Sequence, residues 1–92
     1  MRISHTHEVE GGRVLYPIGR IEAASGWHAS SVSGDWKNVA LQRLIAAAMD
    51  YDADAIVDVD YKVDGVQTFD LSAIPLERIS VSGVAVKLAR AA

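Results

Sequence analysis

Residues 53–61 have the sequence Ala53-Asp54-Ala55-Ile56-Val57-Asp58-Val59-Asp60-Tyr61, which ends one element and opens the clearest strand pattern in the chain. From position 55 to position 63 every odd residue is apolar, whereas Asp58, Asp60 and Lys62 occupy even positions. Alternation with a period of two predicts a strand with one buried face and one solvated face.

The segment before this strand predicts a helix from about Trp36 to Tyr51. Asp35 can accept hydrogen bonds from the free amides of its first turn. At 100° per residue the apolar side chains gather on one face, centred on Leu41, Leu44, Ile45 and Ala48. Asp52 stands where the helix must turn into the strand, and we expect it to have a positive φ because a short polar side chain tolerates the left-handed conformation.

Two further strands are predicted at 12–24 and 77–88, with a loop over 64–76 that carries turn residues at Asp64 and Gly65. Pro17 favours a position at the edge of the sheet because it cannot donate a ladder hydrogen bond. In the last strand the apolar side chains change parity near Gly83, so we expect a bulge at Ser82-Gly83 that returns them all to one face.

The order of elements is therefore β-α-β-β. A strand-helix-strand crossover makes the first two strands parallel neighbours or separates them by one inserted strand, and the apolar last strand favours insertion. We predict an α+β fold for a single domain over residues 1–92. It is a two-layer sandwich whose three-stranded antiparallel or mixed sheet is ordered first-last-second, with the helix on one face.

Composition limits the classes of function. Half of the 92 residues are hydrophobic, which is more than a thin core can bury, so self-association is expected. Nine basic against twelve acidic residues give a net charge of −3, which excludes the basic surface of a nucleic-acid binder. The N-terminal stretch lacks the apolar core of a signal peptide, and no apolar run approaches the ~20 residues of a membrane span, so a cytoplasmic protein is expected.

Residues 53–61, followed by Ile79-Ser80-Val81-Ser82-Gly83-Val84-Ala85-Val86-Lys87, resemble the YbjQ-like family, described as putative heavy-metal-binding proteins. The resemblance implies a fold like the dodecin subunit and a ring-shaped homopentamer of unassigned biochemical role. The sequence departs from the family where Asp52 replaces a common glycine, and where 25–34 shortens a glycine-rich segment. The resemblance transfers no metal ligand.

The histidines are the candidate metal ligands, since a chain without cysteine must use imidazole or carboxylate. His5 and His7 would project from the same face of an extended segment, about 7 Å apart at Cα. A third ligand could be Glu8, Glu10, His28 or a histidine of a neighbouring subunit. The alternative interpretation is that these are solvated residues near a terminus.

Asp58 and Asp60 also share a face of the predicted strand and could hold a hard cation or divide acid and base roles. The structural alternative pairs such residues with solvent or with cross-strand cations, for which the candidates are Arg20, Lys62, Arg78 and Lys87. The sequence has no catalytic triad spacing, phosphate loop or nucleotide fingerprint. We therefore expect a protein that is not an enzyme.

Trp27 and Trp36 flank the loop before the helix. They could stack a flat cofactor between them, but core packing or an interface anchor is the better explanation for both, since tryptophan supplies a large apolar area with one polar group. Our prediction is a non-catalytic homo-oligomer of unassigned role, a pentamer as the resemblance implies, that could bind a divalent transition metal through His5, His7 or His28. The alternative is an oligomeric small-molecule or cofactor-binding module that uses Trp27 and Trp36.

Overall fold

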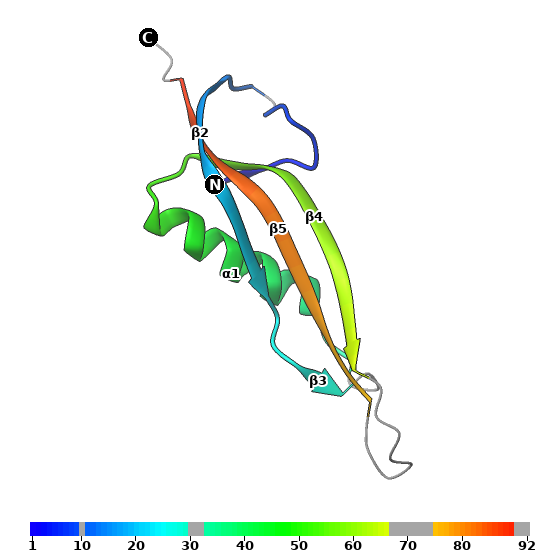
Figure 1. Cartoon of the computed structure of the whole chain (residues 1–92). Helices are drawn as coiled ribbons and strands as arrows, with labels where there is room; N and C mark the ends of the chain where they lie inside the picture. Colours follow the sequence, from blue (N-terminus) through cyan, green and yellow to red (C-terminus); the bar gives the residue numbers. More distant parts are fainter. Residues whose placement is uncertain (10, 30–32, 67–74, 90–92) are drawn as a thin grey trace.

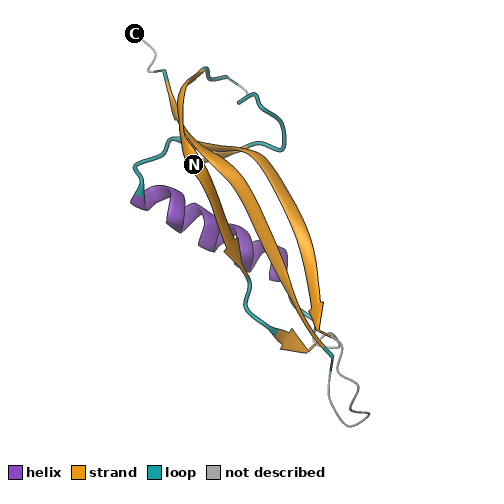
Figure 2. Cartoon of the chain, viewed as in Figure 1, coloured by secondary structure: helices purple, strands orange, loops and turns teal. Residues whose placement is uncertain are grey.

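The computed structural model describes residues 1–9, 11–29, 33–66 and 75–89 of the chain (Figure 1). Within these ranges the elements are β1 (Arg2–Ile3), β2 (Val14–Ala24), β3 (His28–Ala29), α1 (Trp36–Asp50), β4 (Ala55–Val66) and β5 (Leu76–Leu88). They form one α+β arrangement in which α1 lies across one face of a mixed sheet (Figure 2). The described helix is not long and apolar enough to cross a membrane.

The helix forms where the sequence predicts it. Asp35 caps its first turn by accepting a hydrogen bond from the amide of Asn38 at 3.2 Å. Its buried side chains, which lie against the sheet, are Ala40, Leu44 and Ala48. Asp52 follows the helix with a φ of 58°, so the predicted left-handed turn is confirmed.

The three long strands lie in the predicted order, because β5 is between β2 and β4 and antiparallel to both. Pro17 is in the edge strand β2, as expected. The prediction of a three-stranded sheet is too narrow. β1 adds a parallel pairing to the outer side of β4, and β3 pairs with the start of β5, so the sheet has five strands among the described residues.

The predicted bulge at Ser82-Gly83 is wrong, and the irregularity lies on the opposite strand. Against β2, residues 80–84 of β5 pair in regular register. Against β4, Val84 faces Val57 and Ser82 faces Asp60, which leaves one extra residue on β4. Asp58 lies in this bulge with a φ of 52°, in the region where aspartate is one of the few tolerated side chains.

Two small apolar cores result, one on each face of the sheet. On the helix side, the helix packs on Ile56, Val59, Val81 and Ala85. On the other side, Val9 covers Ala55, Val57 and Val86. The prediction that one face of the β4 alternation is buried is therefore wrong. The bulge shifts the parity of β4, so odd residues before it face away from the helix and odd residues after it face the helix.

The chain is long and thin. β4 continues through Asp64 and Gly65 to Val66, so the predicted turn there is wrong; residues 67–74 of the predicted loop lie outside the described residues. The Cα radius of gyration is 16.1 Å, against about 12 Å for a compact domain of this length. The accessible surface of 6360 Å² also exceeds the about 5,200 Å² of a compact monomer of this mass.

Candidate metal centre

The N-terminal segment is fastened to the outer edge of β4 at the bulge. The Ser4 amide donates to the Ile56 carbonyl at 2.9 Å, and the Val59 amide donates to the Ser4 carbonyl at 3.0 Å. The Asp58 amide donates outward to the Thr6 carbonyl at 3.0 Å. The extended geometry expected for this segment is limited to Arg2–Ile3, and residues 5–7 form a bend.

The two histidines of this bend are held by adjacent residues of the bulge. The Nδ1 atom of His5 lies 3.0 Å from the Val59 carbonyl oxygen, and the Nδ1 atom of His7 lies 2.8 Å from Oδ2 of Asp58. Neither a carbonyl oxygen nor a carboxylate can donate, so each Nδ1 carries the proton. In the neutral ring the lone pair is then on Nε2, the atom that a metal would bind.

The structure does not assemble a complete metal site from one chain. Among the described residues, no group of three histidine, aspartate or glutamate side chains is placed to hold one ion. His5 and Glu8 line a hollow of about 800 Å³ inside the N-terminal bend, and His7 is not among its lining residues. Glu10 lies outside the described residues.

His28 is far from the other two histidines. It faces Glu77 near the start of β5. His5 and His7 are held at the β4 bulge, which lies opposite Gly83 of β5. Gly83 is six residues after Glu77, which is about 20 Å along a strand. Its side chain is 7% exposed and its ring stacks on Trp36 with centroids 4.0 Å apart. Its buried Nε2 has no hydrogen-bond partner and lies 3.4 Å from Oε1 of Glu77. Within one chain, His28 therefore cannot join His5 and His7 on one metal ion.

The two tryptophans contact different side chains. The Arg78 guanidinium lies 4.8 Å from the ring centroid of Trp27, which is 46% exposed. One face of Trp36 is covered by the ring of His28. These contacts are those of packing and of a cation–π pair. The use of both rings by a cofactor stays a prediction.

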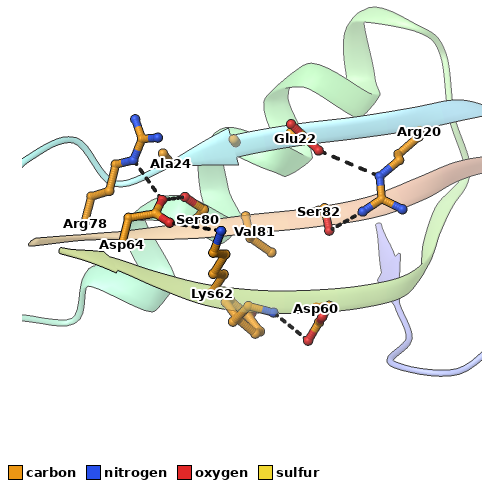
Figure 3. A pocket seen from close by; sticks show the side chains of 12 residues that line it. Arg20, Glu22, Ala24, Asp60, Lys62, Asp64, Arg78, Ser80, Val81 and Ser82 are labelled. Atoms are coloured by element: carbon orange, nitrogen blue, oxygen red, sulfur yellow. Dashed lines mark hydrogen bonds and ion pairs between the residues drawn. The ribbon is translucent and has the colours of Figure 1, made fainter.

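The face of the sheet that is opposite α1 carries a polar hollow of about 550 Å³ (Figure 3). Asp64 accepts hydrogen bonds from Oγ of Ser80 at 2.5 Å and from Nε of Arg78 at 3.0 Å, and Nζ of Lys62 lies 3.6 Å away. The hydrogen bond from Ser80, followed by that from Arg78, lowers the pKa of the Asp64 carboxyl below its ordinary value of 3.8. Pairing with cations was predicted for Asp58 and Asp60, but the carboxylate that pairs with the cross-strand cation Arg78 is that of Asp64.

Asp58 and Asp60 act separately, because the bulge interrupts the regular alternation that would place them on one face. The Asp58 carboxylate binds His7, and Oδ1 of Asp60 accepts from the Tyr61 amide at 3.0 Å. The contact of Asp58 with His7 spans 51 residues of sequence. No local pattern could have predicted that contact.

Comparisons with known proteins agree on the fold. A family model named YbjQ and described as "Putative heavy-metal-binding" matches residues 25–89, a segment that contains His28 and both tryptophans but not His5 or His7. A crystal structure of a protein of unknown function from the DUF74 family of Pediococcus pentosaceus ATCC 25745 has a TM-score of 0.70 at 17% identity, covering 97% of this chain and 98% of that chain. No curated protein matches the chain.

Proposed function

The chain belongs to the YbjQ family, whose description is "Putative heavy-metal-binding", and we propose that it is a non-catalytic homo-oligomer that binds a divalent transition-metal ion through Nε2 of His5 and of His7. The observation that carries this proposal is the pair of hydrogen bonds at Nδ1, one to a backbone carbonyl and one to a carboxylate. Metal-binding imidazoles usually have such a partner on the second nitrogen, since it fixes the tautomer and the ring orientation.

Oligomerisation follows from what one chain lacks. Two imidazoles leave two positions of a tetrahedral ion without a protein ligand, and within the described residues no third side chain completes the group. The large surface and the exposed apolar side chains of Leu15, Tyr16 and Met49 support burial against another copy. The resemblance to a family of pentameric rings makes five copies the expected number, each site receiving its remaining ligand from a neighbour.

Zinc titration by calorimetry tests the ligands. We expect His5→Ala/His7→Ala to lower zinc affinity at least 100-fold, because both imidazole donors are lost. His28→Phe is the matched control, since a phenyl ring preserves the stacking on Trp36 and removes only the ring nitrogens; its zinc affinity should equal that of the unmodified protein. Unchanged affinity and stoichiometry in the double variant would eliminate His5 and His7. No binding by the unmodified protein would eliminate the metal function.

The alternative function is an oligomeric module for a small molecule or cofactor at Trp27 and Trp36. The observation in its favour is the half-exposed ring of Trp27 with a guanidinium on one face, a pair that could stack a flat anionic ligand. This cofactor function has less support than the metal function, because one face of Trp36 is already covered by the ring of His28. A chromophore in the absorption spectrum of the purified protein, lost in Trp27→Leu, would favour this alternative over the metal function.

A further inference from the structure

Two long strand edges have no neighbour among the described residues. β2 pairs only with β5, so its outer edge is open. On β4 the N-terminal segment covers the outer edge up to Val59. The backbone of residues 60–66 pairs with no strand other than β5 among the described residues, and the Tyr61 amide donates to Oδ1 of Asp60. An open edge presents unpaired backbone amides and carbonyls that can accept a further strand.

The charged side chains of these two edges lie on the same face of the sheet, lining the hollow opposite α1 (Figure 3). β2 carries Arg20 and Glu22, whose side chains are 69% and 74% exposed. β4 carries Asp60 and Lys62, and the Lys62 side chain is 80% exposed. The existing ion pair between Arg20 and Glu22 is long at 3.7 Å. Side chains this exposed are available to a second chain at little cost.

The charge order selects one relative direction for these edges. β2 and β4 run in the same direction, because each is antiparallel to β5. If the edges pair in parallel with Arg20 opposite Asp60, then Glu22 is opposite Lys62, and both cross-strand pairs are of opposite charge. The antiparallel alignment of the same residues places Arg20 opposite Lys62 and Glu22 opposite Asp60, which is unfavourable.

We propose that the β2 edge of one copy pairs in parallel with the 60–64 edge of β4 in the next copy, with Arg20 opposite Asp60 and Glu22 opposite Lys62. The contact rests on the self-association proposed above and defines its geometry. It is heterologous, so it propagates in one direction and closes into a ring by rotation. Within one chain Glu22 and Asp60 both face Ser82, so they lie at the same level of the sheet. Between copies Asp60 would instead be opposite Arg20, so each copy is offset from the last by two residues. A closed sheet requires such a stagger.

The first residues of β2, up to Gly19, are not expected to take part in this contact. Register shifts lie between Val14 and Tyr16 and between Pro17 and Gly19, and Pro17 has no amide to donate. The pairing therefore begins near Gly19, one residue before Arg20. On the neighbouring copy it begins just past Val59, whose carbonyl holds His5. The proposed junction thus lies beside the incomplete metal site, where a second chain could supply the missing ligand.

Charge reversal tests the pairing through the mass of the assembly, measured at one protomer concentration by light scattering. We expect Arg20→Glu and Asp60→Arg each to weaken association at least 10-fold and the double variant to recover it. Asp50→Arg, an exposed reversal on the last turn of α1, is the control and should leave the mass unchanged. Circular dichroism of each variant reports whether the chain is folded. Single variants with normal mass, or a folded double variant that fails to recover, would overturn the pairing.

Disulfide crosslinking tests the same contact without relying on charge, because the chain has no native cysteine. We expect a mixture of Arg20→Cys and Asp60→Cys chains to form covalent heterodimers on oxidation, and neither variant to form homodimers alone. Homodimers of Arg20→Cys would indicate a twofold β2–β2 contact, and homodimers of Asp60→Cys a twofold β4–β4 contact; either result refutes the proposal. A monomeric unmodified protein would refute self-association itself, and with it a metal site that is completed by a neighbouring copy. An oligomer that binds zinc but gives homodimers in this assay would refute only the β2–β4 pairing.

Discussion

Replacing Asp58 separates two roles of one residue. Its backbone has a φ of 52° in the β4 bulge, and its carboxylate accepts the hydrogen bond from Nδ1 of His7. Asp58→Gly removes the carboxylate but suits the backbone, and Asp58→Ala removes the carboxylate and strains the backbone. We expect the two variants to lose the same zinc affinity and to differ in stability.

The magnitudes follow from the two contacts. An alanine in the left-handed region costs about 1–2 kcal/mol, and the greater freedom of glycine in the unfolded chain offsets up to about 1 kcal/mol of this. Asp58→Ala should therefore be less stable than Asp58→Gly by about 1 kcal/mol. The lost pair with His7 affects both variants equally and contributes little, since the His7 side chain is 91% exposed. Loss of an orienting partner should lower zinc affinity about 10–100-fold in each.

Urea unfolding at one protomer concentration gives the stability difference, and zinc titration of the same samples gives the affinity. The matched control is Asp50→Ala, which removes another exposed carboxylate without touching a histidine. Equal stability of Asp58→Gly and Asp58→Ala would show that the bulge conformation imposes no constraint. Unchanged zinc affinity in both would show that Asp58 does not orient His7 for a metal.

Three further predictions concern the fold. Gly83→Ala should lower the free energy of unfolding by about 1–3 kcal/mol, because a Cβ there would lie 2.6 Å from Cγ2 of buried Ile56. The control is Gly65→Ala, where a Cβ would have nothing within 4 Å, and its free energy of unfolding in urea should equal that of the unmodified protein. Asp64→Asn should be less stable than the unmodified protein at neutral pH. Folding lowers the pKa of the Asp64 carboxyl below its ordinary value of 3.8. The contribution of Asp64 to the free energy of unfolding is therefore complete above pH 3.8 and is lost as the pH falls through the pKa of the folded state. A stability difference between Asp64→Asn and the unmodified protein that persists in strong acid would contradict this. Asp35→Ala should cost about 1 kcal/mol of stability through the loss of the helix cap, and a thermal midpoint equal to that of the unmodified protein would show that the cap is not used.

The elements that depend on local pattern were predictable. The apolar period and Asp35 define the helix, and Pro17 indicates the edge strand. The parity of β5 was predicted wrongly, because residues on both of its faces are buried: Val81 packs under the helix, and Val86 packs under Val9 of the N-terminal segment. A pattern buried on two faces has the same appearance in sequence as a bulged strand buried on one. Only the tertiary contact of Val9 distinguishes them.

The candidate site was predictable only in its ligands. His5 and His7 are the residues that chemistry selects in a chain without cysteine. Their positions depend on hydrogen bonds to Val59 and Asp58, which follow from the bulge. The bulge adds one residue to a strand whose alternation is otherwise regular, and a one-residue shift leaves no mark on composition or spacing.

The central position of β5 also determines when the sheet can form during synthesis. β5 is the last of the described strands in the chain, yet it separates β2 from β4 and pairs with both. At about 5–20 residues per second, synthesis of β5 is complete roughly 3–13 s after that of β2. Until then neither β2 nor β4 has the strand with which it pairs, so the inner edges of both strands are unpaired on the nascent chain. We expect such a topology, in which both pairings between long strands wait for the final strand, to fold slowly and to be exposed to aggregation in that interval.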